Sequence, residues 1–209
     1  MSKTDVRSEI DQIVQLMIQS VYESTMRVSL SDLLKRKNPF IRDLFFNREK
    51  EFIEFFLNER AERALVTSLG NAMEKISISL IESNQGIIIA SGRKAAPFDL
   101  KFIFGNIEYW MEIKSILEQN SSNLATISKN KLNAEMNGKK FILGVYYSTS
   151  SAAREEYILC GDEYWEFIGG KESQKIVSNS FKKMADHFSI KNIVSNKTED
   201  LYNEFMNKS

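Results

Sequence analysis

The sequence is poor in the residues that build several common kinds of functional site. Its 209 residues include one cysteine, Cys160, and one histidine, His187. A single cysteine forms no intrachain disulfide, which fits a reducing compartment such as the cytoplasm. One Cys and one His also fall short of a zinc site or a His-based metal cluster, and we interpret both as structural residues. Any chemistry therefore has to come from carboxylates, Lys, Ser, Tyr or the backbone.

Charge of one sign and long apolar runs are lacking as well. The 28 Lys and Arg residues balance 28 Asp and Glu residues. Composition therefore gives no argument for nucleic-acid binding, although a locally basic cleft is compatible with a neutral chain. The stretch MSKTDVRSEIDQ is polar and lacks the apolar core of a signal peptide, and no run approaches the roughly 18 apolar residues of a membrane span. We expect a cytoplasmic protein with no membrane partner.

Only two prolines, Pro39 and Pro97, punctuate the chain, whose length is most simply that of a single domain over residues 1–209. Helical periodicity predicts a helical N-terminal part over residues 1–84, which we expect to serve dimerisation or support. The second of its helices has Ser31 as the expected N-cap. The expected helices cover residues 4–23, 29–37, 41–60 and 61–82.

The period changes after residue 84, and residues 85–170 are predicted to form the catalytic sheet core. Residues 171–209 return to helical patterns. The fold class is therefore predicted as α/β (α+β), with a central mixed β-sheet that carries a hairpin, flanking helices and a helical N-terminal layer. The expected strands cover residues 86–90, 98–104, 107–114, 140–147 and 155–160, and a further helix covers 124–136.

A tight hairpin is predicted at Gly105-Asn106, which lies between two runs of strand-like composition. If these two residues form the loop, Asp99 faces Glu112 on one side of the sheet. Lys114 shares the face of Glu112 because the two residues are two positions apart. Phe98, Leu100, Phe102 and Phe104 are then expected to point to the opposite side, towards a core.

Two carboxylates that face each other on a sheet repel unless a further group compensates their charge. Mg²⁺ prefers oxygen ligands and often takes one or two protein carboxylates, with water and substrate phosphate in its other positions. A neighbouring lysine can orient or deprotonate an attacking water and offset charge on the phosphate. The pattern therefore predicts a metal site that cleaves phosphodiesters. The alternative is a solvated hairpin end, where Lys114 merely neutralises Asp99 or Glu112.

The segment "PFD…EIKS", residues 97–115, resembles the PD-(D/E)XK motif, and the whole chain is similar to a small type II restriction endonuclease. The resemblance implies that Asp99 and Glu112, with Ile113, hold one or two Mg²⁺ ions and that Lys114 assists the water. Many members of the superfamily add an acid from the preceding helix. Glu74 is our candidate, since Gly70 one turn earlier would let a strand approach, and Glu62 is the alternative.

A second segment, "CGDEYWEFIGG" (160–170), is similar to an aromatic stretch that follows the sheet in several restriction enzymes, and we expect it to form a turn and an aromatic plug. Phosphate and base contacts are expected from basic and small polar residues around the site. We expect them at Arg93, Lys94, Ser115, Gln119, Asn120, Ser121, Ser122, Asn123, Lys129 and Lys131.

The resemblance implies Mg²⁺-dependent, sequence-specific hydrolysis of double-stranded DNA that leaves 5′-phosphate ends. It also implies a cognate DNA methyltransferase as functional partner. Cutting both strands of a palindromic site calls for two-fold symmetry, so we expect a homodimer that uses the Phe-rich N-terminal helices. Two alternatives stay open: a repair or recombination nuclease such as a junction resolvase, and a non-catalytic binding protein whose Asp/Glu/Lys patch is a surface salt-bridge network.

Overall fold

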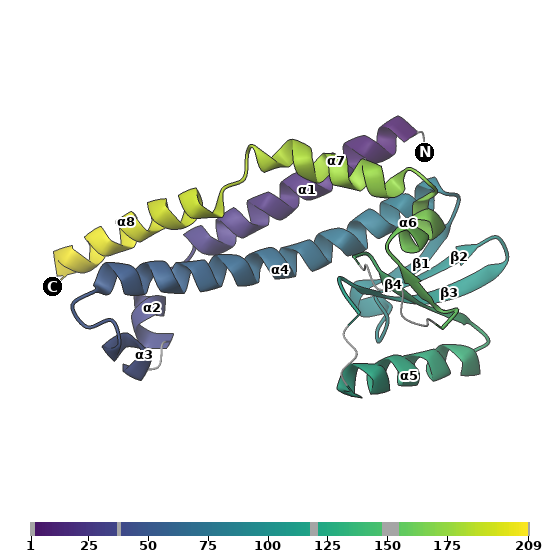
Figure 1. Cartoon of the computed structure of the whole chain (residues 1–209), viewed down its shortest axis with the longest axis horizontal. Coiled ribbons are helices and arrows are strands. Elements are labelled where there is room, and N and C mark those ends of the chain that lie inside the picture. Colours follow the sequence, from purple (N-terminus) through teal and green to yellow (C-terminus); the bar gives the residue numbers. More distant parts are fainter. Residues whose placement is uncertain (1–2, 37–38, 118–120, 148–154, 209) are drawn as a thin grey trace. The chain divides into compact units, whose positions relative to one another are not determined.

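The computed structural model describes residues 3–36, 39–117, 121–147 and 155–208, and its elements are labelled in Figure 1. The chain divides into two compact units: residues 1–11 and 73–180 form unit 1, and residues 12–72 and 181–209 form unit 2. Two long helices, α1 (Lys3–Met26) and α4 (Glu49–Ser83), contribute residues to both units.

Unit 1 is built on a mixed sheet of five strands in the spatial order β1-β2-β3-β4-β5. The first three strands pair antiparallel, whereas β3, β4 and β5 pair parallel. A mixed sheet flanked by helices agrees with the fold class predicted from the sequence. The strands are β1 (Ile87–Ser91), β2 (Leu100–Phe104), β3 (Ile107–Lys114), β4 (Lys140–Val145) and β5 (Ile158–Cys160).

The hairpin between β2 and β3 has the predicted turn, with Phe104 paired to Ile107 and Leu100 to Met111. Gly105 takes a positive φ of 58°, which a glycine adopts without steric penalty. The two-residue loop thereby fixes the register of the hairpin. The prediction for Phe98 was wrong: it packs with Trp110 and Phe141 on the opposite face from Leu100. Strand alternation begins only at Leu100, because residues 95–99 form turns and bends.

Helices cover the two faces of this sheet. Helix α5 (Ser121–Met136) places Ile127 and Ala134 against Leu143 and Val145 of β4 on one face (Figure 1). The other face carries α6 (Asp162–Gly169), whose Tyr164 ring lies against Gly144 of β4. Because neighbouring strand residues point to opposite sides, Gly144 and its neighbours Leu143 and Val145 serve different layers. The short helix η1 (Gly92–Lys94) also belongs to unit 1, and α7 (Ser173–Ala185) begins in unit 1 and ends in unit 2.

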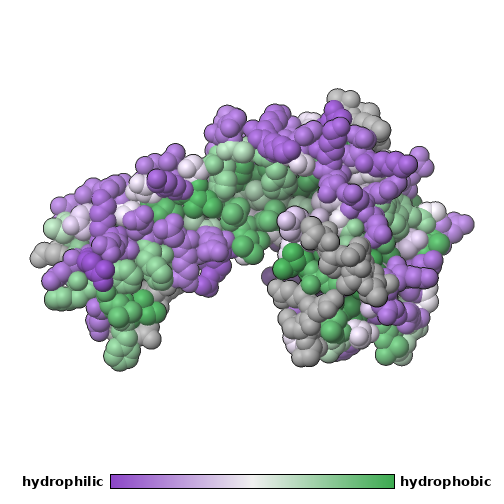
Figure 2. Space-filling view, viewed as in Figure 1, coloured by the Kyte–Doolittle hydropathy of each residue, from purple (hydrophilic) through white to green (hydrophobic). Residues whose placement is uncertain are grey.

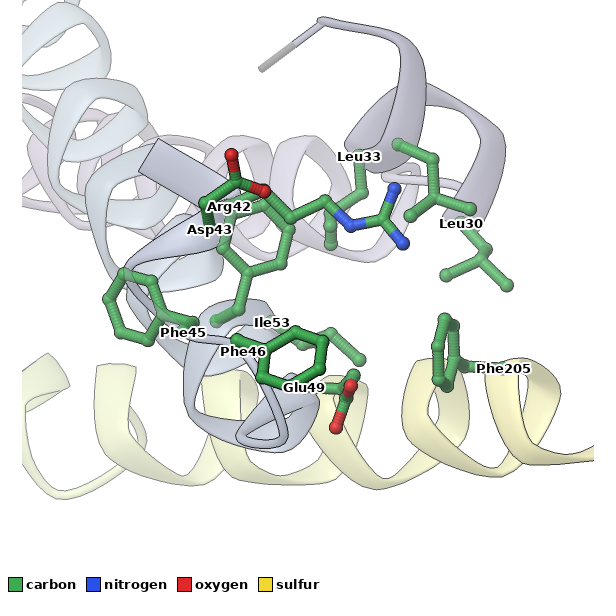
Figure 3. A pocket seen from close by; sticks show the side chains of 11 residues that line it. Leu30, Leu33, Arg42, Asp43, Phe45, Phe46, Glu49, Ile53 and Phe205 are labelled. Atoms are coloured by element: carbon green, nitrogen blue, oxygen red, sulfur yellow. The ribbon is translucent and has the colours of Figure 1, made fainter. Parts of the chain in front are cut away.

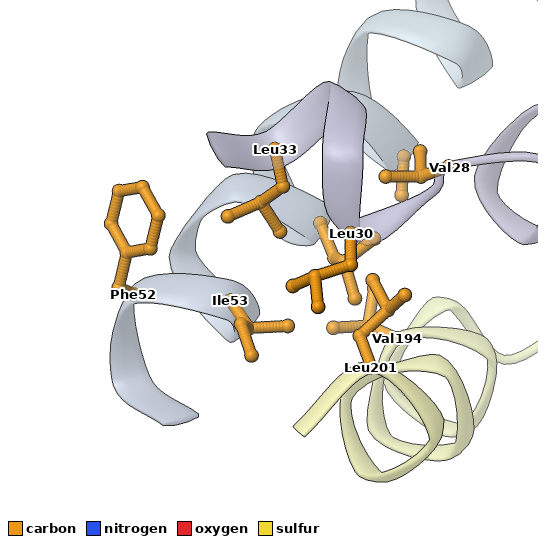
Figure 4. Packing of buried hydrophobic residues seen from close by; sticks show 9 residues of the cluster. Val28, Leu30, Leu33, Phe52, Ile53, Val194 and Leu201 are labelled. Atoms are coloured by element: carbon orange, nitrogen blue, oxygen red, sulfur yellow. The ribbon is translucent and has the colours of Figure 1, made fainter. Parts of the chain in front are cut away.

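Unit 2 has a helical core of its own. Buried side chains of α2 (Leu30–Arg36), α4 and α8 (Ile190–Lys208) meet there, and Figure 4 shows Leu33, Ile53 and Leu201 within this cluster. Leu33 is fully buried, while Ile53 and Leu201 are 1% and 2% exposed. A short helix, α3 (Pro39–Asp43), precedes α4. Removal of these apolar surfaces from water is the main stabilising contribution to such a core.

A predicted N-cap and a predicted division between two helices were wrong. The N-cap of α2 is Ser29, whose Oγ accepts from the Asp32 backbone N–H at 3.1 Å, whereas Ser31 lies inside the first turn. The predicted boundary between a helix at 41–60 and a second helix at 61–82 was also wrong. Residues 44–47 form a turn in which Asn47 takes a φ of 58°, and one continuous helix, α4, follows from Glu49. Helical periodicity had no break at residue 60, so the division lacked a physical signal.

No helix in the described ranges is both long and apolar enough to cross a membrane.

Candidate active site

Three ionisable side chains meet where β2 begins and β3 ends. Glu112 and Lys114 lie on β3, and Asp99 directly precedes β2. The Lys114 Nζ lies 3.4 Å from Glu112 Oε1, while the Glu112 side chain is only 8% exposed and that of Lys114 is 49% exposed. A nearly buried carboxylate beside a half-exposed ammonium group is thus presented at one end of the central strand.

Asp99 is held by the backbone of β3. Its N–H donates to the Met111 carbonyl at 3.0 Å, and its Oδ2 accepts from the Ile113 N–H at 2.7 Å. The regular ladder therefore stops at Leu100–Met111, one pair short of the predicted facing pair of Asp99 and Glu112. The carboxylate takes the backbone donor that a further ladder pair would have used.

The electrostatic environment of Asp99 connects the three groups. Burial raises the pKa of its carboxyl, and the negative charge of Glu112 raises it further. The Ile113 N–H and the Lys114 ammonium act in the opposite direction and lower this pKa. Burial is the largest of these effects, so the pKa of Asp99 lies above its ordinary value, and a nearby cation would favour its ionised form.

Glu74 on α4 is the fourth predicted member of the site. Burial raises the pKa of its carboxyl, and the charge of Asp99 adds to this rise. The alternative, Glu62, is exposed and belongs to unit 2. The reason given for Glu74 was wrong, because Gly70 is exposed and a side chain at that position would meet nothing within 4 Å.

Three groups beside the predicted site residues were missed in the sequence. The amide of Asn130 on α5 donates from Nδ2 to Glu112 Oε2 at 3.2 Å. Tyr146, just after β4, forms a hydrogen bond with the Ser115 side chain, and burial raises the pKa of its phenol. A polar residue in the buried stripe of α5 was the only sequence signal for Asn130, and Tyr146 had none.

The third missed group is the pair of Tyr164 and Ser77, which supports the sheet beneath the site. The Tyr164 hydroxyl lies 2.6 Å from Ser77 Oγ, and Ser77 Oγ itself donates to the Met73 carbonyl at 2.7 Å. The Tyr164 hydroxyl is therefore the donor in the bond between them. Burial raises the pKa of Tyr164, and the nearby charge of Asp99 contributes. Tyr164 and Trp165, 0% and 5% exposed, are the aromatic plug predicted for residues 160–170, here on a helix.

A cavity of about 230 Å³ opens beside Glu112 and Lys114. It is bounded by the residues that follow β3 and by the first turns of α5. Asn123 and Ser115, both predicted to contact DNA, line it. The full lining comprises Glu112, Lys114, Ser115, Ile116, Leu117, Asn123, Thr126 and Ile127.

Two predicted basic residues flank Asp99 from the other side. Arg93 and Lys94 in η1 are exposed, and the neighbouring Gly92 N–H donates to the Asp99 carbonyl at 3.1 Å. This bond brings η1 next to the site.

The remaining predicted DNA contacts lie on or before α5. Ser122 and Lys129 are exposed on this helix, and Lys131 lies 4.6 Å from the centre of the Tyr157 ring. Ser121 is the first residue of α5. Gln119 and Asn120 lie outside the described residues.

The donor set suits a small divalent cation. Within the described ranges, no three His, Cys, Asp or Glu side chains form a group that could hold a metal ion by themselves. Asp99 and Glu112 nevertheless supply two carboxylates whose mutual charge raises the pKa of Asp99. This number of protein carboxylates fits Mg²⁺, which keeps water and substrate oxygens as its other ligands.

A five-stranded mixed sheet flanked by helices is consistent with the restriction-endonuclease-like class of fold. A family model described as type II restriction endonuclease EcoO109I matches residues 4–192, and the chain belongs to this family. The family resemblance seen in the sequence is thereby confirmed. Membership implies a nuclease with DNA as its substrate. A comparison with curated proteins gives no match.

Proposed function

We propose that the protein is a Mg²⁺-dependent restriction endonuclease that hydrolyses phosphodiester bonds at specific sites in double-stranded DNA. The observation that carries this proposal is the juxtaposition of the buried Glu112 carboxylate, the Lys114 ammonium at 3.4 Å and the Asp99 carboxyl of raised pKa. Repulsion between two carboxylates in a largely desolvated place is costly for a purely structural patch. It is an advantage for a site that binds a cation.

Each residue has a role that follows from its position. Asp99 and Glu112, together with the backbone of Ile113, would hold one or two Mg²⁺ ions. Glu74 would add a further carboxylate. When bound, the metal neutralises charge on the phosphate and lowers the pKa of a water ligand. Lys114, half exposed beside Glu112, would orient the attacking water and offset the negative charge that develops on the phosphate. Hydrolysis then leaves a 5′-phosphate and a 3′-hydroxyl end.

DNA is proposed to lie along the exposed side of this site. Arg93 and Lys94 supply positive charge on the η1 side, and Ser115, Asn123 and Lys129 supply polar and basic groups on the α5 side. Contacts of this kind to the phosphates fix the position of a duplex, while Asn and Gln side chains suit base edges. The same proposal extends to Gln119, Asn120, Ser121, Ser122 and Lys131.

A homodimer is proposed because a two-fold axis matches the symmetry of a palindromic site. Unit 2 offers an apolar surface for it, and Figure 2 shows hydrophobic side chains gathered over α2 and α3. Leu44 and Phe46, in the turn that follows α3, are 71% and 77% exposed. They adjoin or line a cavity of about 350 Å³ that has Arg42, Asp43 and Glu49 at its edge (Figure 3). A cognate DNA methyltransferase completes the proposed restriction system.

The test is cleavage of unmethylated phage DNA by the full-length protein with Mg²⁺, with EDTA, and with Lys114→Ala in place of the natural protein. Discrete bands that require Mg²⁺ are expected. Lys114→Ala is expected to lose at least about 100-fold in rate, because removing one group that stabilises charge in the transition state costs about 10²–10³-fold. No cleavage with Mg²⁺ or Mn²⁺ would contradict the proposal, and cleavage of branched DNA alone would indicate a junction-resolving nuclease.

A matched pair of variants tests the fourth carboxylate. Glu74→Gln removes a charge beside Asp99 and is expected to reduce the cleavage rate by about 10–100-fold, the usual effect of removing a group that supports a metal site. Glu62→Gln, an exposed residue of unit 2, should cleave at the natural rate. Equal rates for both variants would remove Glu74 from the site.

A further inference from the structure

The amide of Asn130 occupies an unusual position on α5. The residue is 5% exposed and lies between Ile127 and Ala134, which are 6% and 0% exposed, on the helix face that packs against the sheet. An apolar residue would satisfy packing at such a place, since a buried amide is costly unless its polar atoms find partners. Asn130 finds one: its Nδ2 donates to Glu112 Oε2 at 3.2 Å.

The two carboxylate oxygens of Glu112 have different partners. Oε2 accepts from a buried group on a packed helix, whereas Oε1 lies 3.4 Å from Lys114, which is 49% exposed. The inner oxygen therefore has a buried partner, and the outer oxygen lies on the side of Lys114, which lines the cavity together with Glu112. With its inner oxygen held in this way, the carboxylate has one defined orientation.

The chemical nature of the partner matters as much as its position. A neutral amide donates a hydrogen bond without cancelling the negative charge of the carboxylate. A Lys or Arg at this place would neutralise Glu112 and compete with a cation. An apolar residue would leave a buried carboxylate oxygen without a hydrogen-bond partner and free to turn.

We propose that Asn130 is a positioning residue that holds the Glu112 carboxylate ready to bind the divalent cation. The inference rests on the proposed function, because it assigns to Asn130 a role toward the metal site of the nuclease. Hydrogen-bond partners of this kind orient metal ligands, and removing them usually lowers metal affinity by about 10–100-fold.

The experiment measures cation binding directly and does not depend on cleavage. Mn²⁺ is titrated into metal-free, full-length protein, and the free Mn²⁺ is followed by electron paramagnetic resonance. Asn130→Leu and Asn130→Ala both lack the donor and differ in volume. Each is expected to raise the dissociation constant for Mn²⁺ by about 10-fold or more. DNA affinity without metal, measured by fluorescence anisotropy, should stay unchanged.

Asn133→Leu is the matched control, because it lies one turn away on α5. Its side-chain oxygen accepts from Asn137 Nδ2 at 3.2 Å and does not serve Glu112. This variant is expected to bind Mn²⁺ like the natural protein. Thermal unfolding of each variant separates affinity from stability, since a purely structural role for Asn130 would lower the melting temperature and leave Mn²⁺ affinity unaltered.

Two outcomes would overturn the inference by itself. One is natural Mn²⁺ affinity in both Asn130 variants while Glu112→Gln loses binding. The other is loss of the fold in both variants, which would assign Asn130 to structure alone. Failure of the proposed function looks different: either the natural protein binds no Mn²⁺, or Glu112→Gln binds it as well as the natural protein. In those cases the metal site itself is wrong.

Discussion

At the scale of single residues, the site is a group of carboxylates kept in a place that disfavours their charge. Burial raises the pKa of both Asp99 and Glu74. The charge of Glu112 raises the pKa of Asp99 further, and the charge of Asp99 raises that of Glu74. Without a cation these groups cost folding free energy at neutral pH, because the unfolded chain ionises them more easily. Active sites often reduce the stability of a protein in this way.

The first prediction is that Asp99→Asn stabilises the metal-free protein at neutral pH by about 0.5–2 kcal/mol. The introduced amide oxygen can still accept from the Ile113 N–H, which bonds Asp99 Oδ2 at 2.7 Å, but the buried charge is gone. A raised folded-state pKa means that the natural protein is relatively most stable at low pH and loses this contribution as pH rises through that pKa. The advantage of the variant should therefore shrink as pH falls.

Urea unfolding of both proteins between pH 4 and pH 8 in EDTA measures this difference. A variant less stable than the natural protein at pH 8 would contradict the prediction. It would show that the attraction of Lys114 outweighs the cost of burial at Asp99.

At the scale of elements, β4 and α6 decide whether the sheet can support the site. Tyr164 of α6 is fully buried and lies on β4 at Gly144, where a side chain would meet the Tyr164 ring. The same ring carries the hydroxyl that donates to Ser77 of α4. Because Gly144 has no side chain, α6 and β4 can pack in direct contact at this position.

The second prediction compares two glycines. In Gly144→Ala the added Cβ would lie 2.7 Å from Tyr164 Cδ2, and overpacking of this kind destabilises by about 1–3 kcal/mol. Gly70→Ala, at an open position within α4, should instead stabilise by about 0.5–1 kcal/mol, because alanine is the better helix former. Chemical denaturation of both variants checks the pair, and equal effects would refute the proposed contact.

At the scale of the whole molecule, the proposed dimer depends on the apolar surface of unit 2. Large hydrophobic side chains that remain exposed in a cluster usually mark an interaction surface. Phe46 and Leu44 have this character, and they precede α4, whose first turns carry Phe52, Phe55 and Phe56.

The third prediction is that Phe46→Asp converts the dimer to a monomer, since it places a charge in the proposed apolar interface. Sedimentation velocity measures the change, and the variant should nick supercoiled plasmid where the natural protein cuts both strands. Val66→Asp is the control, because Val66 is 65% exposed on α4 of the same unit. If Phe46→Asp dimerises with unchanged affinity, the dimer interface does not include Phe46.

The sequence by itself determined the hairpin, because its signals are local. Gly105-Asn106 and the alternating runs beside it fix the register as far as Leu100 and Met111, and this leaves Asp99 next to the end of β3 that carries Glu112 and Lys114. The same local reasoning failed at Phe98 and Ser31. One lies before regular alternation begins, and the other lies two residues inside a helix that Ser29 already caps.

Tertiary structure alone decided which distant residues join this group. Asn130 reaches Glu112 because a crossover through α5 leads from β3 to the parallel strand β4, and because α5 is rotated with Asn130 towards the sheet. Glu74 and Ser77 reach the site through the packing of α4 and α6. Helix rotation follows from the summed burial of many apolar side chains, and no short motif contains that information.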